Sequence, residues 1–230
     1  MITKRKYPWI GRQDWSNIVF LHWPVERKYI RPFVPKPLQL DLFNGMAWVS
    51  VVFFQASGTS GRMMPKSIAL PTFNQLNVRT YVYHEKNAER GVYFLDVYID
   101  DLPFSFIGKN LFHLPFQQAD FRHDKRGKME MIQQNDTVFS CFIESEEKLA
   151  RDDLASFLTE RYCIWNLKHE RVIKIPILHK RWKLQRAKVH AVEHQLFPYF
   201  RDKVDSKELV CHYSPFQHSV VFPYEKIKNR

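Results

Sequence analysis

The sequence predicts an α+β fold built mainly from antiparallel strands, organised as one domain over residues 1–230. Aromatic residues are abundant (19 Phe, 10 Tyr and 6 Trp) and glycine is scarce at 7, which favours strands over glycine-loop nucleotide folds. Roughly ten segments have strand character, against three or four with helical spacing, which favours a β-barrel or a large antiparallel sheet. We find no internal repeat and no linker that would divide the chain.

The first strand is expected at the apolar run 18–21, which ends at His22-Trp23-Pro24. Residues 25–34 have helical spacing, and the prolines that follow end that helix. Residues 38–42 alternate as a strand. Asn44-Gly45 is a strong hairpin-turn signal.

A long strand is then expected over 46–55, followed by a loop over 56–72 rich in Ser, Gly, Met and Pro. A loop of that length is typical of a flap or a pocket rim, and we interpret Gly58-Thr59-Ser60-Gly61 as a turn within it. Strands are expected again at 76–83 and 91–99. The first of these places alternate residues on opposite faces, with Asn77, Arg79, Tyr81 and Tyr83 together on one of them.

In the second half, a short helix is expected over 104–113, and Asp152 or Asp153 is expected to cap another helix through Leu158. The acidic segment 144–151 is interpreted as a surface turn and residues 187–196 as a helix. The remaining expected strands are 117–123, 128–134, 137–144, 160–167, 171–177 and 180–184, the last as an exposed strand with two buried residues.

Targeting and redox features favour the cytoplasm. The basic N-terminus is not followed by an apolar region, so we expect no secretory signal. No apolar stretch approaches the ~18 residues that a membrane span needs, and we expect no membrane partner. The cysteines Cys141, Cys163 and Cys211 are odd in number and far apart, as expected of buried or bystander thiols in a reducing compartment.

The chain carries a net charge of +11. Residues 161–190 hold nine Lys or Arg and a single acid, Glu170. Such a stretch could bind nucleic acid or another polyanion. The favoured interpretation is a solvated strand pair, so nucleic acid is not the expected partner.

Residues His190-Ala191-Val192-Glu193-His194 match the inverted zinc-peptidase pattern H-x-x-E-H. On a helix the two histidines would share a face and could hold zinc. The match is short and the chain has 10 His, so we predict a bystander pair, no metal and no cofactor.

Six segments of the chain form a recognisable pattern: 18–25 (IVFLHWPV), 35–41 (PKPLQLD), 47–51 (AWVSV), 76–82 (LNVRTYV), 91–94 (GVYF) and 158–162 (LTERY). Together they resemble the YqjF-like family of uncharacterised bacterial proteins, a distant branch of the acetoacetate-decarboxylase-like superfamily. The resemblance spans most of the chain in order and implies a curved, largely antiparallel β-barrel or cone with an internal pocket and a few flanking helices.

The resemblance also implies where decarboxylase chemistry would lie. The decarboxylases carry a segment of the form R-E-x-x-G-F-P-K-K, which aligns without a gap on residues 109–117. Their Schiff-base lysine and its neighbour fall on Phe116 and Gln117, and their active-site glutamate falls on Gln75. Neither Phe nor Gln can form an imine, and a desolvated amine beside a second cation is what that chemistry needs.

We therefore predict a small-molecule-binding protein without Schiff-base catalysis. Arg79 would hold an anionic group, amides would orient it, and aromatic rings would bury an apolar body. The predicted ligand-binding residues are Gln75, Asn77, Arg79, His22, Trp48, Phe116 and Gln117.

Two alternatives stay open. One is a lyase, hydratase or tautomerase on the same cavity, with His22 or a tyrosine as the acid–base group. The other is a nucleic-acid-binding module that uses residues 161–190. The sequence also leaves homo-oligomerisation open.

Overall fold

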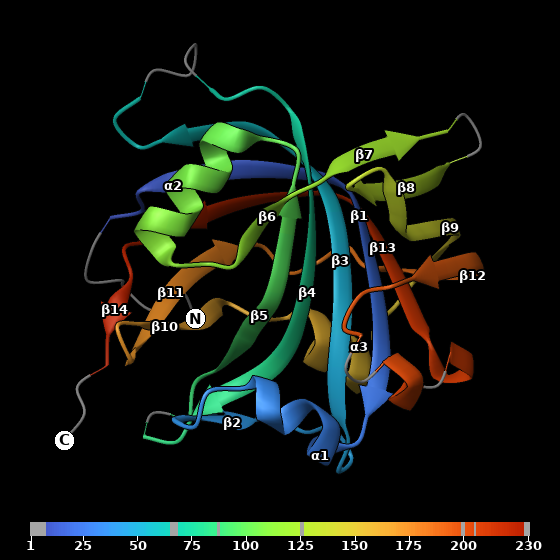
Figure 1. Ribbon diagram of the computed structural model, residues 1–230, viewed down its shortest axis with the longest axis horizontal. Helices are drawn as coiled ribbons and strands as arrows, with labels where there is room; N and C mark the ends of the chain where they lie inside the picture. The colour runs from blue at the N-terminus through green and yellow to red at the C-terminus, as the bar shows by residue number, and fades with distance from the viewer. Residues whose placement is uncertain are drawn as a thin grey trace.

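The computed structural model describes residues 8–64, 69–86, 88–124, 127–198, 201–204 and 206–227. Strands dominate it, as predicted (Figure 1). The helices are α1 (Arg27–Ile30), α2 (Leu102–Phe112) and α3 (Asp153–Thr159). The strands are β1 (Gly11–Val25), β2 (Leu38–Leu40), β3 (Ala47–Gly61), β4 (Phe73–His84), β5 (Arg90–Ile99), β6 (Phe116–Gln118), β7 (Asp120–His123), β8 (Lys128–Gln133), β9 (Asp136–Leu149), β10 (Cys163–Lys168), β11 (Arg171–His179), β12 (Gln185–His194), β13 (Val210–Val221) and β14 (Glu225–Lys226).

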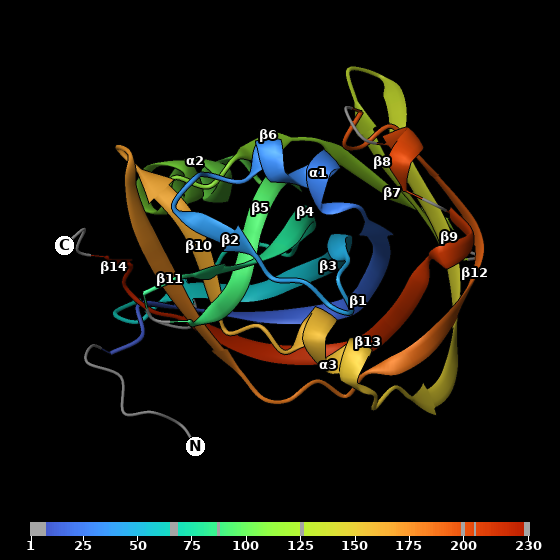
Figure 2. The ribbon, with the colours of Figure 1, turned by 90° about the horizontal axis from the view of Figure 1, so that it is seen from below.

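These strands form one curved sheet in the order β14-β11-β10-β5-β4-β3-β1-β13-β12-β9-β8-β7. An additional pairing of β11 with β13 closes part of the sheet into a ring that surrounds an interior (Figure 2). The strands of the ring are β11, β10, β5, β4, β3, β1 and β13. Beyond β13 the sheet continues as a wing of β12, β9, β8 and β7. The antiparallel α+β fold class predicted from the sequence is confirmed.

Both faces of the central strands are buried, and β1 shows why. Phe20 packs into the hydrophobic cluster inside the ring, whereas its neighbours Val19 and Leu21 pack into a second cluster that includes residues of the wing. Side chains alternate between the faces of a strand, so a nearly continuous apolar run such as residues 18–21 indicates burial on both sides. The interior of the ring is therefore one of two cores, and it is the one that contains the cavity described below.

Each of the two longer helices begins directly after an aspartate that caps it, and Asp152 is one of the two caps expected for α3. Asp101 accepts a hydrogen bond from the backbone N–H of Phe104 at the start of α2, and Asp152 does the same for Ala155 at the start of α3, each at 2.7 Å. Side-chain oxygens at this position satisfy N–H groups that have no partner within the helix. Among the described residues no helix has the length and apolar character needed to span a bilayer.

Two glycines allow close packing beside the interior. A Cβ at Gly91 would lie 2.6 Å from the carbonyl oxygen of Cys163, where β5 runs parallel to β10. A Cβ at Gly108 would lie 2.1 Å from the Phe116 ring, where α2 packs against β6. Both positions require the absence of a side chain, because the neighbouring group occupies its place.

Three local predictions are wrong. The segment expected as a helix at 187–196 is occupied by strand β12, which ends at His194. The chain expected to loop over 56–72 stays in β3 as far as Gly61, so the G-x-x-G segment is strand rather than turn. Residues 65–68 of that expected loop lie outside the described part.

Two further segments also differ from expectation. The acidic segment expected as a turn at 144–151 continues β9 to Leu149. Its charged residues lie on a solvated sheet, where a strand needs no apolar run on its outer face. Residues 180–184 connect β11 to β12 without strand structure, and their Trp182 and Leu184 turn inward.

Candidate functional site

The interior of the ring contains a cavity of about 400 Å³. Its most exposed lining side chains are Met64 and Leu111, which are 43% and 42% exposed, so its mouth lies between the end of β3 and helix α2. From this mouth the cavity extends along β4 towards α3 and the start of β10. The volume lies within the range of small-molecule sites, about 300–1,000 Å³.

Most of the wall is apolar and much of it is aromatic. Trp15 and Trp182 stack with their ring centroids 6.1 Å apart, and Trp182 meets Phe20 edge-on at 5.1 Å. The aromatic lining residues are Trp15, Phe20, Phe54, Phe94, Phe104, Phe112, Phe116 and Trp182. Such a wall favours a ligand with a flat apolar body.

Strand β4 supplies a row of polar side chains to this apolar cavity. Gln75, Asn77 and Arg79 alternate along it and all three line the cavity. Gln75 and Asn77 are only 7% and 5% exposed, and the Gln75 Nε2 donates a hydrogen bond to the Asn77 Oδ1 at 2.8 Å. The row therefore runs from amides near the mouth to a guanidinium further in.

Arg79 is a partly buried arginine without a carboxylate partner among the described residues. Its Nη2 donates to the backbone carbonyl oxygen of Leu158 at 3.2 Å, whereas its Nε is buried without a hydrogen-bond partner. Phe20 and Tyr81 each hold a ring centroid 5.9 Å from the guanidinium carbon. None of the ion pairs in the described ranges includes Arg79. Burial lowers the pKa of Arg79, which reflects the cost of keeping this charge away from water.

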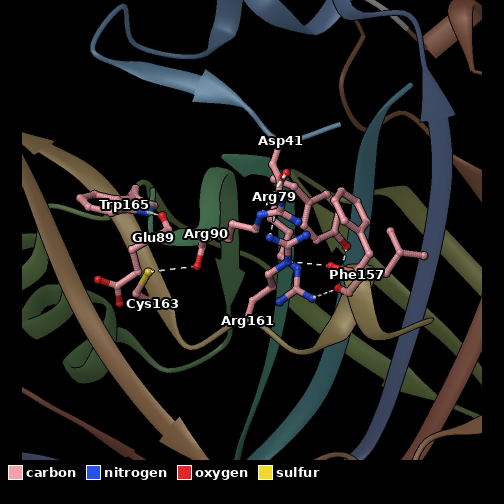
Figure 3. Close-up of polar contacts among 10 residues, drawn as sticks. Asp41, Arg79, Glu89, Arg90, Phe157, Arg161, Cys163 and Trp165 are labelled. Carbon is pink, nitrogen blue, oxygen red and sulfur yellow. Dashed lines mark hydrogen bonds and ion pairs between the residues drawn. The ribbon is translucent and has the colours of Figure 1, made fainter. Parts of the chain in front are cut away.

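The neighbouring Arg161 is compensated. Its Nη1 lies 2.6 Å from the Asp41 Oδ2, and both side chains are almost fully buried (Figure 3). Its Nε donates to the carbonyl oxygen of Phe157 at 2.6 Å. The guanidinium carbon lies 5.0 Å from the centroid of the Tyr81 ring, which Arg79 also approaches.

Helix α3 positions both arginines through its C-terminal carbonyl groups. The last carbonyls of a helix have no partner within it and carry partial negative charge. Here the carbonyl oxygen of Leu158 accepts from Arg79 and from the Tyr81 hydroxyl, and that of Thr159 accepts from the Trp182 Nε1 at 2.9 Å. These bonds fix side chains of the inner wall, but carbonyl dipoles do not neutralise a full positive charge.

The charge balance of the lining is positive. Of the described residues that line the cavity, Arg12, Arg79 and Arg161 are charged, and none is acidic or a lysine. Arg12 lies near the mouth, where its Nε donates to the Ser60 Oγ at 2.9 Å. His179 also lines the wall, and burial lowers its pKa. After Asp41 has paired with Arg161, Arg12 near the mouth and Arg79 further in remain without a carboxylate partner among the described residues.

The sequence matches a known family over most of its length. The model of the family DUF2071, described as "Uncharacterized conserved protein", matches residues 12–218. The chain belongs to this family. A relative, the "Uncharacterized protein YqjF" of Bacillus subtilis (strain 168), is 28% identical over 226 residues, covering 95% of this chain and 93% of its own.

Solved structures extend this relationship at the level of fold. The enduracididine biosynthesis enzyme MppR matches with a TM-score of 0.69 at 9% identity, covering 98% of this chain and 91% of its own. The acetoacetate decarboxylase of Legionella pneumophila matches with a TM-score of 0.66 at 11% identity, covering 100% and 92%. An acetoacetate-decarboxylase-like enzyme of Sphingomonas wittichii RW1 matches with a TM-score of 0.63 at 11% identity, covering 97% and 95%. The YqjF-like resemblance and the acetoacetate-decarboxylase-like fold predicted for this DUF2071 chain are confirmed.

Four of the seven predicted ligand-binding residues line the cavity of this DUF2071 chain: Gln75, Asn77, Arg79 and Phe116. Gln117 does not, because it follows Phe116 on β6 and projects from the opposite face. It is exposed, and its Nε2 donates to the Asp96 Oδ1 at 2.7 Å.

His22 and Trp48 are buried but do not line the cavity. The His22 Nδ1 and the Tyr81 hydroxyl each lie 2.6 Å from the Ser50 Oγ. Burial lowers the pKa of His22 well below its ordinary value, and His212 and Arg79 lower it further. This group packs below the cavity and does not reach it.

Sequence reasoning missed the second arginine and its partner. Arg161 and Asp41 lie 120 positions apart but are hydrogen-bonded in the fold. Both stand in motifs that carry the family resemblance, at the end of residues 35–41 and within residues 158–162. Two oppositely charged residues in separate motifs are a signal that could have suggested a buried pair. His179 and Trp182 had no comparable signal.

The H-x-x-E-H pattern lies outside the cavity, and two cations of the basic stretch are held in ion pairs. On β12, the His190 Nε2 lies 3.0 Å from Glu144 Oε2, and the His194 ring packs 5.4 Å from that of Trp23. In the described ranges no three or more His, Cys, Asp or Glu side chains are grouped to hold a metal ion. Within the basic stretch 161–190, Lys174 is buried and ion-paired with Glu89 and Glu225, as Arg161 is with Asp41.

Proposed function

We propose that this protein binds a small organic anion with an apolar, ring-bearing body in the cavity, with Arg79 as the anchor of the anionic group. The observation that carries the proposal is the partly buried guanidinium of Arg79, whose buried Nε has no hydrogen-bond partner and which lines a cavity whose described lining has no acidic residue. A buried charge is costly unless it is paired. An anionic ligand would supply the missing partner through charge-assisted hydrogen bonds.

The rest of the wall supports an anion with a hydrophobic body. Eight aromatic side chains line the cavity, so a ligand ring would replace water against flat apolar surfaces. A protein of the same fold, MppR, has been solved in complex with pyruvate, which is a carboxylate. This supports a carboxylate as the anionic group, and we expect the protein to work in the cytoplasm.

The proposed role is binding without imine formation. The position that the resemblance assigns to the Schiff-base lysine is Phe116 in the cavity wall, and the next position, Gln117, lies outside the cavity. The described lining has no lysine. The protein would hold its ligand non-covalently.

The test is isothermal titration of the purified protein with 3-phenylpropionate and with the neutral 3-phenylpropan-1-ol. We expect the acid to bind more tightly than the alcohol, and Arg79→Met to weaken the acid by about 10- to 100-fold, as for loss of a charge-assisted hydrogen bond. Binding of the alcohol should change little.

Arg171→Met is the matched control, because Arg171 is an exposed arginine outside the cavity. It should bind both compounds as the wild type does. Equal affinity of the wild type for acid and alcohol, or an Arg79→Met variant that binds the acid normally, would overturn the assignment of Arg79.

A further inference from the structure

The amide pair Gln75–Asn77 has unused hydrogen-bonding capacity inside the cavity. The single bond between the two side chains uses the Gln75 Nε2 and the Asn77 Oδ1. Neither the Gln75 Oε1 nor the Asn77 Nδ2 has a partner within the described ranges, although both residues are more than nine-tenths buried and line the cavity. A buried amide normally makes more than one hydrogen bond.

The unused atoms form a complementary set. One carbonyl acceptor and at least one N–H donor remain, and this holds whichever way the two amides are oriented, because reversing both exchanges the roles of the residues. A ligand ketone could only accept from the N–H, and an ammonium could only donate to the carbonyl. A hydroxyl group does both, so it satisfies the pair completely.

The spacing between the amide pair and Arg79 sets the distance between the two polar groups of the ligand. Asn77 and Arg79 are two residues apart on one face of β4, and such a step is about 7 Å along a strand. A benzene ring with substituents on opposite sides is of comparable length. The aromatic side chains that line the same cavity would enclose that ring.

We propose that the ligand is a hydroxylated aromatic monocarboxylate, whose carboxylate lies at Arg79 and whose ring hydroxyl is bound by Gln75 and Asn77. This assignment rests on the proposed function, since it takes Arg79 as the anchor. It predicts one negative charge at the inner end of the cavity, because Arg161 there is paired with Asp41 and Arg79 has no carboxylate partner among the described residues. A second carboxylate at the amide pair would face a carbonyl oxygen without a cation.

The ring hydroxyl would act as the specificity determinant. When a ligand lacks the group that a buried amide should bind, the amide loses its water on binding and gains nothing in return. We therefore expect selectivity between two ligands that differ in a single oxygen atom.

The experiment titrates the wild-type protein with 3-phenylpropionate and with its 3-hydroxyphenyl and 4-hydroxyphenyl analogues. We expect at least one hydroxylated acid to bind 10-fold or more tightly than the unsubstituted acid. Gln75→Leu/Asn77→Leu should abolish this ratio, whereas Gln117→Leu, which removes an exposed amide outside the cavity, should preserve it. Arg79→Met should weaken all the acids by a similar factor.

The outcomes separate this assignment from the proposed function. If the acids bind equally and still depend on Arg79, the anchor stands and the hydroxyl assignment is wrong. If no acid binds, both are wrong. The wild-type comparison needs no variant, so a double variant that fails to fold does not prevent the decision.

Discussion

Arg79 and Arg161 approach the same tyrosine ring, yet within the described part of the chain only Arg161 has a carboxylate partner. A buried pair whose members are both hydrogen-bonded can be retained at little net cost, whereas a single buried charge is expensive. The protein keeps Arg79 at a position where a neutral side chain would be less costly. Such local instability is typical of binding sites, where a ligand supplies the missing interaction.

Replacing Arg79 should therefore stabilise the ligand-free protein. We expect Arg79→Met to raise the free energy of unfolding by about 1–2 kcal/mol, because a well-packed apolar side chain avoids the desolvation of an unpaired charge. Urea denaturation of both proteins at neutral pH without ligand measures this change in the free energy of unfolding. A marked loss of stability would mean that the bond to the Leu158 carbonyl outweighs the cost of burial.

Asp41 should show the opposite behaviour. Asp41→Asn would leave Arg161 without its partner 2.6 Å away, and breaking a buried pair in this way costs about 3–5 kcal/mol. The same denaturation experiment measures it. Asp202→Asn is the matched control, because Asp202 is 84% exposed in its ion pair with Arg201, and such surface pairs contribute about 0–1 kcal/mol.

The buried histidines below the cavity should make stability depend on pH. Burial lowers the pKa of His212 to about 4, and the pKa of His22, whose ring lies 5.5 Å away, is also lowered. Asp152 and Arg186 act on His212 with opposite signs, and Arg79 acts on His22. The unfolded chain binds protons at these sites from about pH 6.5 downwards whereas the folded chain does not, so stability falls as pH falls from about 6.5 towards 4.

Each of these two histidines should contribute a slope of up to about 1.4 kcal/mol per pH unit in that window. Urea denaturation at pH 7 and pH 5 measures the loss for the wild type. His212→Gln should lose less stability between the two values. His218→Gln, at a side chain that is 56% exposed, should behave as the wild type does, and an unchanged loss in His212→Gln would contradict the prediction.

At the scale of elements, the sequence predicted which face of a strand a residue occupies better than how far the cavity extends along that strand. The alternation expected over residues 76–83 placed Asn77 and Arg79 on one face, because a strand repeats every two residues, and the family resemblance added Gln75. All three line the cavity. Alternation does not tell how far along the strand a cavity extends. Here it stops near Arg79, where Ser50, Tyr81 and His22 hydrogen-bond one another, so the predicted His22 and Trp48 lie in packed core.

The helix expected at 187–196 was misread for a different reason. Strand β12 alternates between inner and outer residues but shifts register between Val189 and Ala191. The shift, a β-bulge or similar irregularity, brings Val189 and Val192 to the same side although they are three positions apart. A spacing of three is typical of a helix, so a single-sequence pattern could not distinguish the two.

Closure of the ring depends on a short contact between β5 and β10, and Gly91 lies at it. Gly91→Ala would force a Cβ to within 2.6 Å of the Cys163 backbone, and we expect a loss of about 1–3 kcal/mol, as for overpacked cores. Gly11→Ala is the control, since its nearest contact is the Val221 side chain at 3.1 Å, which can move. Thermal denaturation of both variants measures the difference, and equal melting temperatures would show that β10 moves without cost.

For the whole molecule, the fold of decarboxylase-like enzymes is present while the described lining of the cavity has no lysine. A fold does not fix an activity, because activity depends on the side chains that a site presents. An imine needs a neutral amine, and burial beside a cation is what lowers the pKa of a lysine enough to provide one. This cavity offers apolar surroundings and the cation of Arg79, but Phe116 stands where the resemblance puts the lysine.

We therefore predict that the wild type forms no imine with pyruvate and that one substitution in the cavity wall allows an imine to form. Sodium borohydride added with pyruvate should leave the wild-type mass unchanged, because no described cavity residue can form an imine. Phe116→Lys should place an amine in the apolar wall of the cavity, where burial lowers its pKa, and should be trapped as a covalent adduct at residue 116 by peptide mass spectrometry. Gln117→Lys, on the exposed face of β6, keeps an ordinary lysine pKa and should give little adduct. A wild-type adduct would show that a lysine reaches the cavity, and would reopen the choice between a binding protein and an enzyme.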